Sequence, residues 1–96
     1  MERKRIPYGT KLPVKLTLRE RELILDHTFC DPEYVRFAAA DGKGIRVDLS
    51  LDEIEDIQGY VAAEANHTDD EKIEKELDAL YDKLQRFLDE YDDQES

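Results

Sequence analysis

The stretch that decides the fold of this chain runs from Ser50 to Tyr91, and reads SLDEIEDIQGYVAAEANHT (50–68) followed by DDEKIEKELDALYDKLQRFLDEY (69–91). Apolar residues recur in both halves at steps of three and four, which is the spacing of one face of an amphipathic helix. We therefore expect two helices joined by a tight link at residues 66–68, with the rest of the chain packed against the pair.

The first of these helices has a clear start. Ser50 and Glu53 stand at capping-box spacing, in which the hydroxyl and the carboxylate each accept a backbone N–H of the first turn. Gly59 lies in the helix interior, where it costs about 1 kcal/mol relative to alanine, and three alanines follow within residues 62–65. A helix face made of such small side chains predicts that another backbone packs closely against it, most simply that of the second helix. The expected buried positions are Leu51, Ile54, Ile57, Val61 and Ala65.

The second helix carries a heptad pattern. Thr68 and Glu71 repeat the capping-box spacing, and the seam consists of Ile73, Leu77, Leu80, Leu84, Phe87 and Tyr91. We expect the first two heptads to pack antiparallel against the first helix. The second helix should be the longer one, with 23 residues over 69–91 against 16 over 51–66, so its end should overhang. Four residues there form the predicted interface with the sheet, a protein partner or a second copy: Leu84, Phe87, Leu88 and Tyr91.

Before this pair, the chain predicts a strand and a helix. Apolar and polar residues alternate over residues 12–16, which favours a half-buried strand, and Pro13 restricts that strand to an edge or a start. Thr17 and Glu20 give another capping box, so a helix should begin at Leu18 and stop by residue 31. Its expected buried stripe comprises Leu18, Leu25 and Phe29, widened by Leu23 and Ile24.

Residues 31–49 admit two interpretations. Asp31-Pro32-Glu33 resembles a helix start, with an end at the alanines before Gly42. Alternation on both sides of the turn sequence at residues 41–44 instead favours a β-hairpin, in which paired residue numbers should sum to an even value, as for Phe37 with Val47 and Arg36 with Asp48. With the strand at 12–16 the hairpin makes a three-stranded sheet. The predicted fold is therefore α+β: a small three-stranded sheet with one helix, then an antiparallel pair of C-terminal helices.

Length and charge set the domain organisation. Ninety-six residues suffice for one domain, which we place at 12–91, between a flexible basic arm at 1–11 and a disordered acidic tail at 92–96. Residues 1–50 hold 10 basic and 8 acidic side chains (+2), and residues 51–96 hold 4 and 17 (−13), which gives the net charge of −11. The excess negative charge should keep the protein soluble and favours binding of a basic partner. The same charge should repel free nucleic acid.

Cellular setting can be inferred only coarsely. The chain has a single cysteine, so it forms no internal disulfide, and it contains no apolar run of membrane-spanning length. Its basic start leads into Pro7 and Gly9 rather than into an apolar segment typical of a secretory signal. We expect a cytoplasmic protein that does not enter a membrane.

A zinc-type metal site is the alternative function. His27 and Cys30 lie three residues apart at the predicted end of one helix, and Glu64 and His67 lie three apart at the end of another, so that four ligands of the right type exist. Against this, no Cys-x-x-Cys pair is present, and a cysteine at a helix end is commonly core filling.

Catalytic and cofactor motifs are lacking. Cys30 beside His27 has no signature of an oxyanion site around it, and the turn at residues 41–44 is too short for a phosphate loop. The basic arm has one aromatic residue, Tyr8, among its charges, which is weak for nucleic-acid binding. We therefore expect no enzyme and no cofactor, but a small acidic protein-interaction module that acts through its C-terminal helix, with itself as a homodimer or with another protein.

Overall fold

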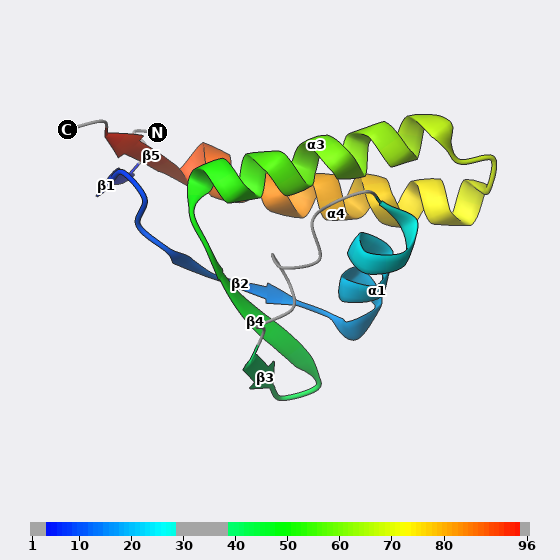
Figure 1. Ribbon diagram of the computed structural model, residues 1–96, viewed down its shortest axis with the longest axis horizontal. Helices are drawn as coiled ribbons and strands as arrows, with labels where there is room; N and C mark the ends of the chain where they lie inside the picture. The colour runs from blue at the N-terminus through cyan, green and yellow to red at the C-terminus, as the bar shows by residue number, and fades with distance from the viewer. Residues whose placement is uncertain (1–3, 29–38, 95–96) are drawn as a thin grey trace.

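The computed structural model describes residues 4–28 and 39–94 of the chain (Figure 1). Its elements are β1 (Lys4–Pro7), β2 (Leu12–Leu16), α1 (Leu18–His27), β3 (Ala39–Asp41), β4 (Gly44–Leu49), α3 (Leu51–His67), α4 (Glu71–Glu90) and β5 (Tyr91–Gln94). The α+β layout predicted from the sequence is confirmed: a three-stranded antiparallel sheet and one helix precede an antiparallel helical pair. A small parallel pair of strands, β1 and β5, was not predicted.

The helical pair forms the largest contact in the fold. Figure 1 shows α3 and α4 side by side along the long axis of the molecule, so that the start of α3 lies beside the end of α4. The apolar stripes of both helices are buried, as their spacing predicts. The completely or nearly completely buried residues of the pair are Leu51, Ile54, Ile57, Val61, Leu77, Leu80 and Leu84.

The connection between these helices differs from the prediction. Ser50 caps α3 through a full capping box, as expected. The cap of α4 is Asp70, whose carboxylate accepts the N–H groups of Lys72 and Ile73, whereas Thr68 is the C-cap of α3. An aspartate directly before the helix accepts hydrogen bonds from the free N–H groups, and its negative charge is stabilised by the positive end of the helix. A threonine two residues earlier provides neither effect. The two helices therefore span 17 and 20 residues, which is closer in length than predicted.

Gly59 does not serve the close helix contact that the sequence suggested. Its backbone is exposed, and a β-carbon built there would have no atom outside its own helix turn within 4 Å. The thin face of α3 at Gly59 and Ala63 thus points away from α4, because the buried stripe of this helix runs through Ile54, Ile57 and Val61.

The three-stranded sheet follows the order β2-β4-β3, with both neighbouring pairs antiparallel. Between β2 and β4, each buried residue faces another buried residue, in the pairs Leu12 with Leu49, Val14 with Val47 and Leu16 with Ile45. The row of exposed residues includes Pro13, and β2 is an edge strand of this sheet, which is where proline is tolerated. The strand predicted at residues 12–16 is confirmed.

The hairpin register is not the predicted one. Ala39 pairs with Arg46, Ala40 with Ile45 and Asp41 with Gly44, so the paired numbers sum to 85 rather than to an even value. The two-residue turn sets this register: Gly42 has a φ of +60°, and a positive φ at the first central residue is typical of a type II′ turn. All of β3 is exposed, so no buried face enforces another register. The predicted pairs of Arg36 and Phe37, and the choice between helix and strand at 31–38, lie outside the described residues.

Helix α1 begins at Leu18 behind the predicted Thr17–Glu20 capping box. Its buried residues are Leu23 and Ile24, whereas Leu18 is 59% exposed and Leu25 only partly buried; Phe29 lies outside the described residues. The predicted stripe was therefore centred on the wrong side of the helix. Two ion pairs join this helix to α4, where Arg19 contacts Glu76 at 2.6 Å and Glu20 contacts Lys83 at 2.7 Å.

The two ends of the described chain meet. β1 and β5 pair in parallel, from Lys4 opposite Tyr91 to Pro7 opposite Gln94, where the sequence predicted a flexible arm and a disordered tail. Figure 1 shows both strands at one end of the helical pair. A basic segment lies along an acidic one, and Ile6 packs against the core. Neither segment has a sequence pattern that would predict a strand. Each strand also depends on the other for its hydrogen bonds, so neither would form alone.

Candidate functional site

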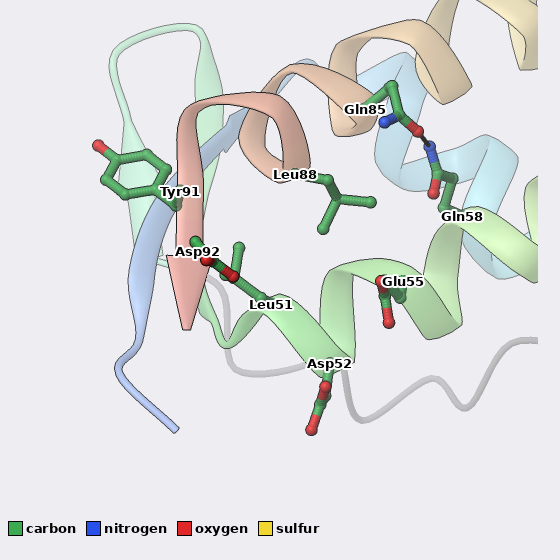
Figure 2. A pocket seen from close by; sticks show the side chains of 8 residues that line it. All are labelled: Leu51, Asp52, Glu55, Gln58, Gln85, Leu88, Tyr91 and Asp92. Carbon is green, nitrogen blue, oxygen red and sulfur yellow. Dashed lines mark hydrogen bonds between the residues drawn. The ribbon is translucent and has the colours of Figure 1, made fainter. Parts of the chain in front are cut away.

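A pocket of about 300 Å³ lies where the start of α3, the end of α4 and β5 come together. We call it the acidic pocket. Its described lining residues are Leu51, Asp52, Glu55, Gln58, Gln85, Leu88, Tyr91 and Asp92, shown as sticks in Figure 2. The antiparallel arrangement of the helices creates it, because residues more than 30 positions apart in the chain are placed on one wall.

The charged groups of the acidic pocket are all carboxylates. Asp52 and Glu55 belong to the first two turns of α3, where negative charge is favoured by the positive helix end, and Asp92 belongs to β5. Asp52 also accepts a hydrogen bond from the Tyr8 hydroxyl at 2.5 Å. Figure 2 shows the side chains of Asp52 and Glu55 extending from the same side of α3. The described lining contains no basic residue to neutralise these three groups.

The lining of the pocket is mainly polar, and Leu51 and Leu88 contribute its smaller apolar part. Leu51 is 6% exposed, and Leu88 lies in the space between the two helices in Figure 2. At the inner end, the buried Gln58 amide donates to Gln85 Oε1 at 2.7 Å and to the Tyr81 carbonyl at 3.4 Å. This link holds the two helices in register across an otherwise apolar seam and closes the pocket on that side.

Lys11, which precedes β2, is engaged at the start of α3. Lys11 is hydrogen-bonded and ion-paired with Glu53, which does not line the pocket. Burial raises the pKa of Glu53, but hydrogen bonds from Lys11 and Ser50 and the charge of Lys11 outweigh that effect and lower it. Lys11 is therefore held by Glu53 rather than by a carboxylate of the acidic pocket, whereas Arg5 of β1 stands opposite Asp92 in the strand pair.

The predicted interface overlaps this pocket in part. Leu88 and Tyr91 line it, whereas Leu84 is 1% exposed and belongs to the core. Phe87 is partly buried against that core. The end of α4 does not overhang as expected, because β5, β1 and the start of α3 lie around its last turn.

Sequence reasoning missed the part of the site that α3 contributes, namely Leu51, Asp52, Glu55 and Gln58, together with Gln85 and Asp92. One signal could have found it. In an antiparallel pair, the acidic first turns of α3 must lie beside the last turns of α4, so the carboxylates and the predicted aromatic patch belong to one surface.

The predicted metal ligands lie on separate elements. His27 is the last residue of α1, and Glu64 and His67 lie in the last turn of α3. Within residues 4–28 and 39–94, no group of three or more His, Cys, Asp or Glu side chains is arranged to hold a metal ion, and these three form no such group. Cys30 lies outside the described residues, so the four-residue site remains a prediction.

Comparisons with known protein families, with curated proteins and with solved structures find no match for this chain. In the part of the chain that the structure describes, none of the helices combines the length and the apolar character needed to cross a bilayer. Functional inference for this chain therefore rests on the chemistry of its own surface.

Proposed function

We propose that this chain is a non-catalytic binding module whose acidic pocket holds a lysine or arginine side chain of a partner protein. The observation that carries the proposal is the combination of three carboxylates, Asp52, Glu55 and Asp92, with the apolar Leu51 and Leu88 in one cavity. Lysine and arginine side chains have an apolar stem and a charged head, so they can use both parts of such a lining.

The end of α4 supports the same ligand chemistry. Helix C-termini carry partial negative charge, which basic residues in the last turn usually compensate. The last turns of α1 and α3 each contain a histidine, whereas the last turn of α4 contains no basic residue. A cation supplied by a partner at this end would interact with the helix dipole and with the carboxylates together.

The described lining residues favour binding over covalent chemistry. They include no histidine, cysteine, serine, threonine or lysine, so the lining lacks a nucleophile paired with a histidine or lysine base, and its carboxylates are used here as ligands of a cation. Self-association through this face, which the sequence also suggested, would bring two sets of carboxylates together in a two-fold dimer. We therefore propose a different, basic protein as the partner.

The proposal can be tested with a fluorescein-labelled peptide of alternating leucine and arginine, measured by anisotropy at low salt. The variant Asp52→Asn/Glu55→Gln should weaken binding about 3- to 10-fold, since each exposed ion pair is worth about 0.2–1 kcal/mol. A matched control is Asp78→Asn/Asp82→Asn, which removes the same charge from exposed positions of α4 outside the pocket and should change the affinity less than 2-fold.

If both double variants weaken peptide binding equally, the affinity depends only on the net charge of the protein, and the proposal that the pocket binds the peptide is wrong. The same peptide with glutamate in place of arginine should not bind. Light scattering of the free protein provides a further check, because a stable dimer that the Asp52→Asn/Glu55→Gln variant strengthens would assign this face to self-association instead.

A further inference from the structure

A second pocket, on the sheet side of the molecule, has the opposite charge. It measures about 230 Å³ and is lined by Lys15, Leu16, Thr17, Asp41, Lys43, Gly44, Ile45 and Lys83. We call it the lysine pocket. Three of the seven lysines of the chain lie on this one cavity, from β2, from the turn between β3 and β4, and from α4. Their proximity is a product of the tertiary structure, since they are far apart in sequence.

The described lining carries a formal charge of +2, from three lysines and Asp41, in a chain whose net charge is −11. Lys83 is fixed, because its ammonium donates to Glu20 Oε1 at 2.7 Å. Lys15 lies 3.7 Å from the Asp41 carboxylate, longer than the roughly 2.7–2.9 Å of a charge-assisted hydrogen bond. Lys43 makes no ion pair or hydrogen bond among the described residues. Two of the three ammonium groups are thus able to turn toward a ligand.

The floor of the pocket is apolar and closely built. Leu16 and Ile45 are 3% and 9% exposed and form the apolar part of the lining, whereas the side chain of Lys15 lies on the exposed face of β2. Gly44 lies against the end of β2, and a β-carbon at this position would come 2.5 Å from the Leu16 carbonyl oxygen. The absence of a side chain at Gly44 therefore lets the turn that carries Lys43 approach the strand that carries Lys15.

We propose that the lysine pocket binds the phosphate dianion of a small phosphate ester. Counted with Glu20, which holds Lys83, these groups carry +1, so an anion is drawn chiefly to Lys43 and Lys15, and lysine ammonium groups are common point-charge ligands of phosphate. The volume is below the roughly 300–1,000 Å³ of pockets that hold drug-sized molecules, so the bound group is small. Leu16 and Ile45 provide apolar contact for the carbon group that the ester carries. The inference is independent of the acidic pocket.

The test is a titration of the ¹⁵N-labelled full chain with phenyl phosphate, inorganic phosphate and acetate, at constant pH and ionic strength, followed by two-dimensional NMR. Phenyl phosphate should shift the amide signals of Thr17, Gly44 and Ile45 in a saturable way, and more tightly than inorganic phosphate does. If inorganic phosphate binds as tightly as phenyl phosphate, the site binds the free ion and the proposal of an ester ligand is wrong.

Variants locate the binding. Lys43→Gln and Lys15→Gln should each weaken phenyl phosphate binding roughly 2- to 5-fold, as for loss of one exposed charge contact. Lys75→Gln removes the same charge from an exposed position of α4 outside the pocket and should leave the affinity within about 2-fold. Equal effects of all three variants, shifts without saturation, or acetate binding as tightly as phosphate would each overturn the proposal. The spectra themselves report whether each variant is folded.

Discussion

The start of α3 supports both the core and the acidic pocket, and replacing Ser50 with alanine tests how it does so. Ser50 Oγ accepts the Glu53 N–H at 3.3 Å, and Glu53 Oε1 accepts the Ser50 N–H at 3.0 Å. The residues on either side of this capping box, Leu49 and Ile54, are buried where a hydrophobic staple would place them. Ser50 itself is 8% exposed, so water has little access to the groups that the substitution leaves free.

The expected cost can be worked from this geometry. Loss of an N-cap serine typically costs about 1 kcal/mol, with a range of about 0.5–2. The 3.3 Å hydrogen bond is long, which lowers the expected loss of stability. Burial raises the expected loss, because the freed N–H is poorly hydrated. We expect Ser50→Ala to reduce the free energy of unfolding by about 1–1.5 kcal/mol, or the melting temperature by roughly 4–12 °C for a domain of this size.

Urea unfolding followed by circular dichroism measures this change, provided that the denaturant slope stays the same in the variants. The matched control is Thr17→Ala, which removes the same kind of cap from α1 at an exposed position and should cost about 0.5 kcal/mol. A cycle with Glu53→Ala should show coupling of about 0.5–1 kcal/mol, because the two hydrogen bonds form one box. A Ser50→Ala cost no larger than that of Thr17→Ala, or additive effects in the cycle, would refute the reasoning.

Two further predictions concern glycine and pH. Gly44→Ala should destabilise the protein by about 1–3 kcal/mol, because the new β-carbon would clash with the Leu16 carbonyl oxygen. In the same unfolding assay, Gly59→Ala should stabilise the protein by about 0.4–1 kcal/mol. A Gly44→Ala variant as stable as the parent would contradict the close approach of Gly44 to Leu16. The folded-state pKa of Glu53 is below its ordinary value of 4.5, so the stability from its charge is present above pH 4.5 and lost as the pH falls through the folded-state pKa. Glu53→Gln should therefore be less stable than the parent at neutral pH and equal to it in acid, and a difference that persists in acid would speak against the Lys11 contact.

Much of the fold could be predicted because its signals are local. The capping boxes at Thr17 and Ser50 place the starts of α1 and α3 correctly, since a cap involves only residues within one helical turn. Alternation at residues 12–16 predicts β2 for a similar reason, because a strand with one buried face must alternate with a period of two. The same kind of evidence fails at Thr68, where Asp70 is a competing cap only two residues away.

The candidate site was predictable only in part. The heptad pattern directed attention to the end of α4, and Leu88 and Tyr91 do line the acidic pocket. The pattern could not separate them from Leu84, which occupies the same stripe but is covered by the rest of the chain. Burial at a given heptad position depends on how far the neighbouring elements extend, and the sequence of one helix does not contain that information.

By itself, the sequence determined where α1 and α3 begin, which residues form the apolar stripes of α3 and α4 and that an acidic half follows a weakly basic one. The tertiary structure decided the hairpin register, the pairing of β1 with β5 and the assembly of both pockets. The physical reason is the range of the interactions. Caps and periodicity act between residues a few positions apart, whereas each pocket joins side chains from elements that meet only when the core closes.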